Sequence, residues 1–211
     1  TAHCPNSGSM LSVDTPGADV WLSRADKPDR VLAYTWELIR IGPALVGINT
    51  GWPNRLVEEA IAERRLPDLD GYASLRREVR YGRNSRIDLL LESPGRPTCF
   101  VEVKNVTLKR GSGRDEPVAF PDAVTVRGTK HLAELAEVVR QGGRAVMLFV
   151  TQRADAERLT FAADIDSSYA RAVQSAEQAG VTLLCYRCRV AVDGIGLADA
   201  IPITSPTPAP D

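Results

Sequence analysis

The sequence has no long apolar run. None of its stretches approaches the roughly 20 consecutive apolar residues that a membrane-spanning helix requires. Charge of one sign is not in excess either, because 26 Lys and Arg stand against 27 Asp and Glu. The first residues contain neither the basic segment nor the apolar segment of a secretory leader. These absences predict a soluble protein with no membrane partner, in which any nucleic-acid surface is confined to one part of the chain.

Cysteine is scarce, with four in 211 residues, which is too few for a disulfide scaffold and favours a reducing cytoplasm. Cys185 and Cys188 have the spacing of a zinc-ligand pair. They lie within a predicted strand, where residues three apart face opposite sides, and the sequence has no second pair of this kind. We therefore expect no structural zinc.

The chain divides into two predicted domains and a tail. Residues 1–50 are predicted to be an OB-like β domain, because apolar or alternating stretches at 18–23 and 31–41 are separated by turn residues. Residues 51–200 form the second predicted domain. The Pro-rich tail, 201–211, is expected to be floppy and to contribute nothing to a core.

The second domain has the pattern of an α/β (α+β) fold. A helix at 55–65 precedes three successive strands, and helix and strand then alternate, which is typical of a mixed sheet flanked by helices. The predicted strands are 75–81, 86–92, 98–104, 144–150 and 181–190, and the later helices are 128–141 and 166–179.

Three charged residues lie in two neighbouring predicted strands. Glu102 and Lys104 are two residues apart on one strand, so they face the same side, and Asp88 on the preceding strand is about one strand spacing away. Burying two carboxylates among apolar neighbours is costly unless a cation compensates them, and a hard divalent metal is the expected cation. Lys104 could then orient a water or stabilise charge at a phosphate.

The competing interpretation is a solvent-facing ion pair, which is the usual role of an isolated Glu-x-Lys. Asp88, fourteen residues before Glu102, favours the metal site instead. The combination resembles the Asp…Glu-x-Lys pattern of the PD-(D/E)xK nuclease superfamily.

Longer blocks resemble the sugar fermentation stimulation protein A (SfsA) family and cover almost the whole chain. They are HCPNSGSM at 3–10, YTWEL at 34–38, VGINT at 46–50, NRL at 54–56, SRID at 85–88, VEVKNVTL at 101–108, FPDAVT at 120–125 and RGTKHL at 127–132.

This resemblance implies an N-terminal OB-like barrel that here lacks its first strands, followed by a nuclease-like domain. It also implies DNA binding and a regulatory link to sugar metabolism. Glu58 and Glu59 both flank the apolar stripe of the first helix, so periodicity does not choose between them; the resemblance favours Glu59 as a further carboxylate of the metal site.

Positive charge is concentrated between Arg76 and Lys130, where twelve Lys and Arg outnumber seven Asp and Glu. Such clusters contact phosphates without reading sequence. Lys130 and His131 open a predicted helix, whose N-terminus suits a phosphate. The predicted DNA-binding residues are Arg76, Arg77, Arg80, Arg83, Arg86, Arg127 and Lys130.

Two functions remain open. The first is a DNA nuclease that uses Mg²⁺ or Mn²⁺, with Asp88 and Glu102 as metal ligands and Lys104 and Glu59 completing the catalytic set. The second is a non-catalytic DNA-binding regulator of sugar (maltose) metabolism genes. In both, DNA is bound without strong sequence preference, because the sequence contains no recognisable helix-turn-helix or zinc finger.

Overall fold

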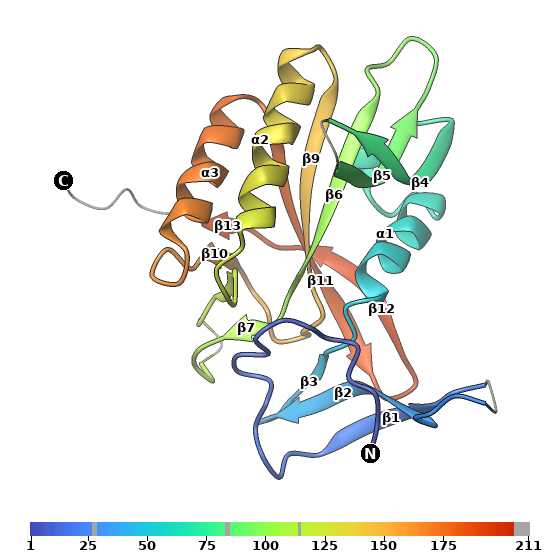
Figure 1. The fold of residues 1–211 in the computed structure, drawn as a ribbon, viewed down its shortest axis with the longest axis vertical. Helices are drawn as coiled ribbons and strands as arrows, with labels where there is room; N and C mark the ends of the chain where they lie inside the picture. The colour runs from blue at the N-terminus through green and yellow to red at the C-terminus, as the bar shows by residue number, and fades with distance from the viewer. Residues whose placement is uncertain (27–28, 83–84, 114, 205–211) are drawn as a thin grey trace.

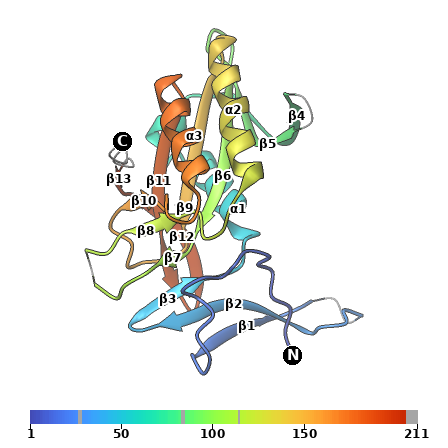
Figure 2. The same ribbon diagram turned by 60° about the vertical axis from the view of Figure 1, so that its left-hand side comes forward.

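The computed structural model describes residues 1–26, 29–82, 85–113 and 115–204. Its N-terminal part is a three-stranded antiparallel sheet in the order β1-β2-β3, at the bottom of Figures 1 and 2. The strands are β1 (Val20–Arg24), β2 (Tyr34–Ile41) and β3 (Ala44–Gly47). The first residues of the chain join this sheet through a bridge between His3 and Thr35. This part is therefore all-β, as the sequence predicts.

A six-stranded mixed sheet in the order β12-β11-β9-β6-β5-β4 organises the rest of the chain. The strands β6, β9 and β11 are parallel, and β4, β5 and β12 pair antiparallel to their neighbours. The bounds are β4 (Ser74–Tyr81), β5 (Ser85–Glu92), β6 (Cys99–Val106), β9 (Arg144–Thr151), β11 (Thr182–Ala191) and β12 (Gly194–Ala200). A mixed sheet flanked by helices is confirmed.

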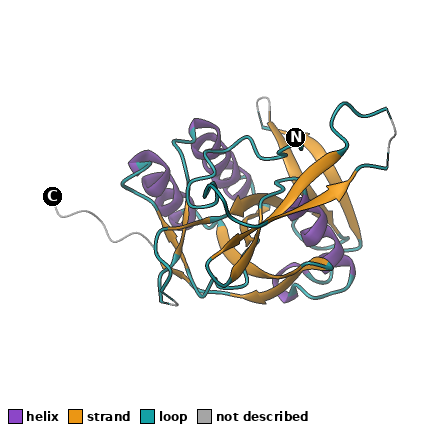
Figure 3. Cartoon of the chain, turned by 90° about the horizontal axis from the view of Figure 1, so that it is seen from below, coloured by secondary structure: helices purple, strands orange, loops and turns teal. Residues whose placement is uncertain are grey.

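Helices cover both faces of this sheet, as Figure 3 shows from below. The helices α2 (Val126–Arg140) and α3 (Ser167–Gln178) pack on one face, in a core with Phe149 and Leu90. The helix α1 (Trp52–Ala62) packs on the other, in a core with Leu89 and Val101. None of the helices that the structure describes is long and apolar enough to cross a membrane.

Short-range signals set the helix ends. Pro53 lies in the first turn of α1, where its missing N–H costs nothing. Thr125 caps α2 by accepting from the N–H of Gly128, and Asp166 caps α3 by accepting from the N–H of Tyr169. A turn of 3₁₀ helix, η1 (Pro67–Leu69), connects α1 to β4.

A second, four-stranded sheet in the order β13-β10-β8-β7 was not predicted. Its strands are two or three residues long: β7 (Leu108–Lys109), β8 (Val118–Phe120), β10 (Leu159–Phe161) and β13 (Ile203–Thr204). Strands this short have no visible period in the sequence.

The prediction for the start of the tail is wrong. Ile201 is buried in the core beneath α2 and α3, and its N–H donates to the carbonyl of Cys185 at 2.9 Å. Ile203 pairs with Leu159. These residues contribute to the core because their partners lie far away in sequence, where composition alone does not show them. The tail beyond Thr204 lies outside the described residues.

The N-terminal sheet is attached to the second part of the chain through Gly47. Its N–H donates to the carbonyl of Gln152 at 2.8 Å, and Val46 bridges to Arg153. A Cβ on Gly47 would lie 2.6 Å from Gln152 Oε1 and 3.0 Å from Ile195 Cδ1. Glycine is thus required by the close approach of the two sheets.

Gly47→Ala should lower the free energy of unfolding by about 2 kcal/mol, because the added methyl group overpacks this junction. The measurement is urea unfolding. Gly196→Ala is the matched control, since nothing lies within 4 Å of the Cβ it would gain. Equal free energies of unfolding for the two variants would show that the junction does not require glycine at position 47.

Candidate functional site

The strands β5 and β6 diverge next to two carboxylates. They pair through Leu89–Leu91 opposite Cys99–Val101. At the following step, the N–H of Val103 donates to Asp88 Oδ2 at 2.7 Å. The carboxylate of Asp88 thus replaces the backbone carbonyl that would accept this hydrogen bond in a regular antiparallel pair, at the point where the two strands separate.

On β5, the alternation of side chains between the two faces of the sheet is interrupted at this level. Ile87 packs in the core beneath α2 and α3, whereas Leu89, two residues later, packs in the core beneath α1. Residues two apart on a regular strand would share one face. Glu78 on β4, between the residues that pair with Leu89 and Ile87, has a positive φ of 53°. This irregularity directs Asp88 away from the core and into the gap between the strands.

Glu102 is the buried centre of the site, with 3% of the residue exposed. Its Oε1 accepts from Lys104 Nζ at 2.7 Å and contacts His131 Nδ1 on α2. Burial acts to raise the pKa of this carboxyl, but the contacts with His131 and Lys104 outweigh burial and hold the pKa below its usual range. Glu102 is therefore an ionised carboxylate inside the protein.

Both ring nitrogens of His131 have polar contacts. Arg127 Nε lies 3.3 Å from His131 Nε2, whereas His131 Nδ1 contacts Glu102 Oε1 and lies 3.4 Å from Lys104 Nζ. Arg127, His131 and Lys104 together fix one oxygen of Glu102. The other oxygen, Oε2, is buried and has no hydrogen-bond partner among the described residues.

Asp88 is held differently. Its Oδ1 accepts from Asn54 Nδ2 on α1 at 2.9 Å, and its Oδ2 accepts from Val103. Burial, followed by the negative charge of Glu102, raises the pKa of Asp88. The two carboxylates thus lie close enough to repel each other, and Lys104 only partly compensates them.

Tyr81 adds a hydroxyl group to this region. The hydroxyl is buried and has no partner among the described residues, and its ring packs on Phe100 with centroids 5.6 Å apart. Burial raises the pKa of Tyr81, and Glu102, Glu134 and Asp88 raise it further. The hydroxyl therefore remains protonated and can donate a hydrogen bond.

The structure brings Glu102 and Lys104 into direct contact and places Asp88 at the adjacent strand level, but it does not bring Glu59 to them. Glu59 is exposed and lines a hollow with Glu37 and Trp52 at the junction with the N-terminal sheet. Glu58 lies one helical turn after Asn54, on the same side of α1, and pairs with Arg77 at 3.2 Å. The α1 residue that contacts Asp88 is Asn54.

The predicted DNA-binding residues differ in how they are paired. Arg76 binds Glu92 at 2.9 Å, Arg77 binds Glu58, and Lys130 lies 3.6 Å from Glu134. Arg80 and Arg86 face each other across β4 and β5, and both are exposed. Arg83 lies outside the described residues.

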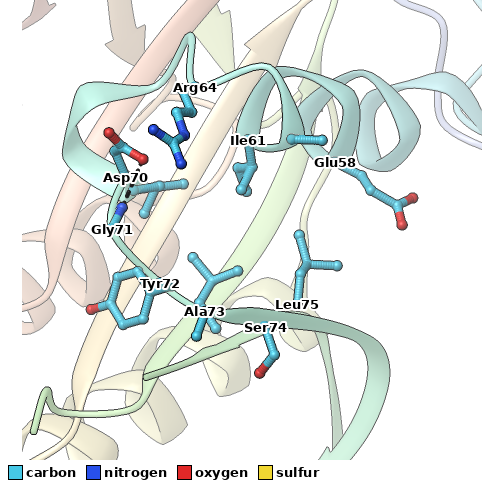
Figure 4. A pocket seen from close by; sticks show the side chains of 12 residues that line it. Glu58, Ile61, Arg64, Asp70, Gly71, Tyr72, Ala73, Ser74 and Leu75 are labelled. Carbon is cyan, nitrogen blue, oxygen red and sulfur yellow. Dashed lines mark hydrogen bonds between the residues drawn. The ribbon is translucent and has the colours of Figure 1, made fainter. Parts of the chain in front are cut away.

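No group of three or more His, Cys, Asp and Glu side chains that could hold a metal occurs in the described part of the chain, and this includes the surroundings of Asp88 and Glu102. A hollow of about 480 Å³ lies between α1 and the start of β4 (Figure 4); it is lined by Ile61, Tyr72 and Leu75, and Glu58 is at its edge, pointing outwards. Cys185 and Cys188 are buried in the cores on opposite faces of the sheet, as predicted, so they cannot form a zinc pair.

Sequence reasoning missed Asn54, Tyr81 and the direct contact between His131 and Glu102. His131 was identified only as an opening residue of a helix. One signal for this contact is present in the sequence: His131 lies four residues before Leu135, so the helical period places it on the buried side of α2. Asn54 and Tyr81 had no such signal, because their contacts depend on how α1 and β4 meet β5.

The comparisons with known proteins cover both parts of the chain. The model described as "SfsA N-terminal OB domain" matches residues 1–48, and "Sugar fermentation stimulation protein RE domain" matches residues 51–194. The chain belongs to the sugar fermentation stimulation protein family. Within this family, a homolog from Rhodospirillum rubrum is 55% identical, covering 98% of this chain and 87% of the relative. A homolog from Brucella melitensis is 51% identical, covering 96% and 84%.

A solved structure of a family member has the same fold. It is titled "The structure of Pyrococcus Furiosus SfsA in complex with Ca2+" and superimposes with a TM-score of 0.85 at 25% identity, covering 96% of this chain and 85% of that one. The N-terminal sheet described above is thus the OB part of the family fold.

Lys104→Met should lower the free energy of unfolding at pH 7 by about 3 kcal/mol, because it leaves Glu102 buried with less compensation. Since the pKa of Glu102 is lowered in the folded state, its favourable contribution exists above the unfolded pKa and is lost as the pH falls through the folded pKa. The cost of Lys104→Met should therefore shrink below about pH 4. Urea unfolding of the parent and the variant at pH 7 and at pH 3.5 measures the cost of the substitution at each pH.

Arg140→Met is the matched control, because Arg140 and its partner Glu137 are both largely exposed. It should change stability by less than about 0.5 kcal/mol. A cost of Lys104→Met as small as that of the control would show that Glu102 does not depend on the ammonium.

Proposed function

We propose that this protein hydrolyses phosphodiester bonds in DNA with a divalent cation, Mg²⁺ or Mn²⁺, held by Asp88 and Glu102. One observation carries the proposal: Glu102 is an ionised, buried carboxylate with one oxygen fixed by Lys104 and His131 and the other without a partner in the described chain. A buried acceptor of this kind is costly unless it meets a cation or a donor.

The donor set suits a hard cation. Two carboxylates completed by substrate phosphates and water are the usual ligands of Mg²⁺ in phosphoryl-transfer sites. Both Asp88 oxygens accept one hydrogen bond each and retain a lone pair for a ligand. The relative from Pyrococcus furiosus is described as a complex with Ca²⁺, another oxygen-preferring cation, which supports a metal at this fold. A bound cation would supply charge stabilisation at the phosphate and lower the pKa of a coordinated water.

Side chains of the protein would orient the water, position the carboxylate and donate hydrogen bonds to the substrate. Lys104 pairs with Glu102 and is partly exposed, so its ammonium could orient a water or neutralise charge on a phosphate oxygen. His131 keeps Glu102 in one orientation, and the protonated hydroxyl of Tyr81 can donate to a substrate oxygen. Since the described geometry gives Glu59 no contact with these residues, the proposal does not include it.

We assign the proposed phosphate contacts to Arg80 and Arg86. Like charges directly across two strands repel, so the pair is stabilised by an anion between them. Arg86 is two residues before Asp88 on β5, so a phosphate bound there would lie near the carboxylates. Arg76 and Arg77 already have acidic partners. Such backbone contacts give salt-sensitive binding without sequence preference.

The competing function is a non-catalytic, DNA-binding regulator of sugar-metabolism genes. A separate observation favours it: both oxygens of Asp88 accept hydrogen bonds from the protein itself, as those of a structural carboxylate do. In either case we place the protein in the cytoplasm, because all four of its cysteines are free and three are buried.

Asp88→Asn should weaken Mn²⁺ binding about tenfold or more and abolish metal-dependent cleavage, because a neutral amide is a poor ligand for a hard cation. DNA binding in EDTA should be unchanged or tighter, since the substitution removes a charge that repels phosphate. The measurements are calorimetric Mn²⁺ titration, cleavage of supercoiled DNA and fluorescence anisotropy.

Glu137→Gln is the control, because Glu137 is an exposed carboxylate on α2 that pairs with Arg140. It should leave all three measurements as in the parent. A parent protein that binds DNA but neither binds Mn²⁺ nor cleaves would rule out the nuclease and leave the regulator.

Arg80→Gln and Arg86→Gln should each weaken DNA binding and reduce the slope of log K against log salt by about 0.9, the value for one lost phosphate contact. Arg76→Gln, on the same strand but paired with Glu92, should change the slope much less. Equal slopes for all three variants would refute the distinction between Arg76, which pairs with Glu92, and the arginines that face each other across β4 and β5.

A further inference from the structure

Two valines are strongly exposed beside the site. Val124 is 70% exposed and Val126 is 80% exposed. Val124 lies in the loop that leads into α2, and Val126 is the first residue of that helix. We call these two side chains the valine tip. Single exposed apolar residues are ordinary on protein surfaces, so exposure alone assigns no role to the tip.

The segment that carries the tip is fixed at both ends. Ser9 Oγ, from the N-terminal part of the chain, donates to the Asp122 carbonyl at 2.7 Å and lies 3.0 Å from Asp122 Oδ2. The N–H of Thr125 donates to Asp166 Oδ2 at 2.8 Å, and Asp166 is the buried N-cap of α3. The loop that carries Val124 is therefore tied both to the N-terminal part of the chain and to α3, which reduces the ordering entropy lost when a ligand packs on it.

The surroundings of the tip are cationic and connected to the site. Arg127 and Lys130 are exposed in the first turns of α2, directly after Val126. Arg127 contacts His131, which in turn contacts Glu102. An occupant of the tip would therefore meet apolar surface at the valines and positive charge at Arg127 and at Lys130, whose ion pair with Glu134 is long at 3.6 Å.

We infer that the valine tip packs against unstacked bases of a DNA strand whose phosphates contact Arg127 and Lys130. In straight duplex DNA the faces of the bases are covered by their neighbours. At a gap, a flap or a kink, a base face becomes available, and proteins insert apolar side chains at such places. The inference rests on the proposed function and specifies its substrate class: DNA with locally unpaired or unstacked bases.

The test compares two DNA probes in EDTA, where no cleavage occurs. One is a 30-base-pair duplex, and the other is the same duplex with a four-nucleotide single-stranded gap; both are fluorescently labelled for anisotropy. For the double variant Val124→Ser/Val126→Ser, we expect about tenfold weaker binding to the gapped probe, because apolar contact is lost. Binding to the intact duplex should change less than twofold.

Val192→Ser is the matched control, since Val192 is 61% exposed in the turn between β11 and β12. It should leave binding to both probes unchanged. All the valines concerned are exposed, so the variants should melt at the temperature of the parent, which thermal unfolding verifies.

Equal weakening on both probes, or an equal effect of Val192→Ser, would overturn the inference. So would unchanged binding of the double variant to the gapped probe, the result expected if the tip docks a protein. In these cases the parent still binds DNA, and the proposed function stands. If the parent binds neither probe, both the proposed function and the inference fail.

Discussion

The buried charge of Glu102 is the constraint around which the site is built. An ionised carboxylate with 3% exposure must be compensated, and here three residues on two elements contribute: Lys104 on β6, and His131 and, behind it, Arg127 on α2. The compensation is confined to one oxygen, and the second oxygen remains without a partner in the described residues. The separation of β5 from β6 leaves a second carboxylate, Asp88, whose pKa is raised by burial and by the negative charge of Glu102. Compensating one oxygen while adding a second carboxylate is what one expects of a site that receives a cation.

The sequence predicted the strands that carry Asp88, Glu102 and Lys104, because long apolar runs broken by turns are strong signals and because a period of two fixes which residues share a face. It could not predict how Asp88 is held. That depends on the change of faces between Ile87 and Leu89 and on Asn54 arriving from α1, which are tertiary events. For the same reason periodicity could not choose between Glu58 and Glu59, whereas the packing of α1 directs Glu58 towards β4 and leaves Glu59 at the N-terminal junction. The short strands β7, β8, β10 and β13 escaped prediction because their pairing partners are distant in sequence.

The N-terminal OB part is connected to the site region as well as to the rest of the fold. Gly47 and Gln152 hold its sheet against the second part of the chain, and Ser9 holds the loop that precedes α2. Since α2 supplies His131 and Arg127, the N-terminal segment helps to position the helix that compensates Glu102. The two family domains are therefore linked at the helix that carries His131 as well as at Gly47.

The most direct test of the central claim is a crystal structure of the protein soaked in Mn²⁺, with anomalous diffraction data to locate the ion. The account predicts an anomalous peak in contact with Glu102 Oε2 and an oxygen of Asp88, at about 2.0–2.6 Å, the range of metal–oxygen distances for hard divalent cations. The claim would be contradicted if millimolar Mn²⁺ produced no peak there while Asp88 remained bound to Asn54 and Val103, because the two carboxylates would then be structural.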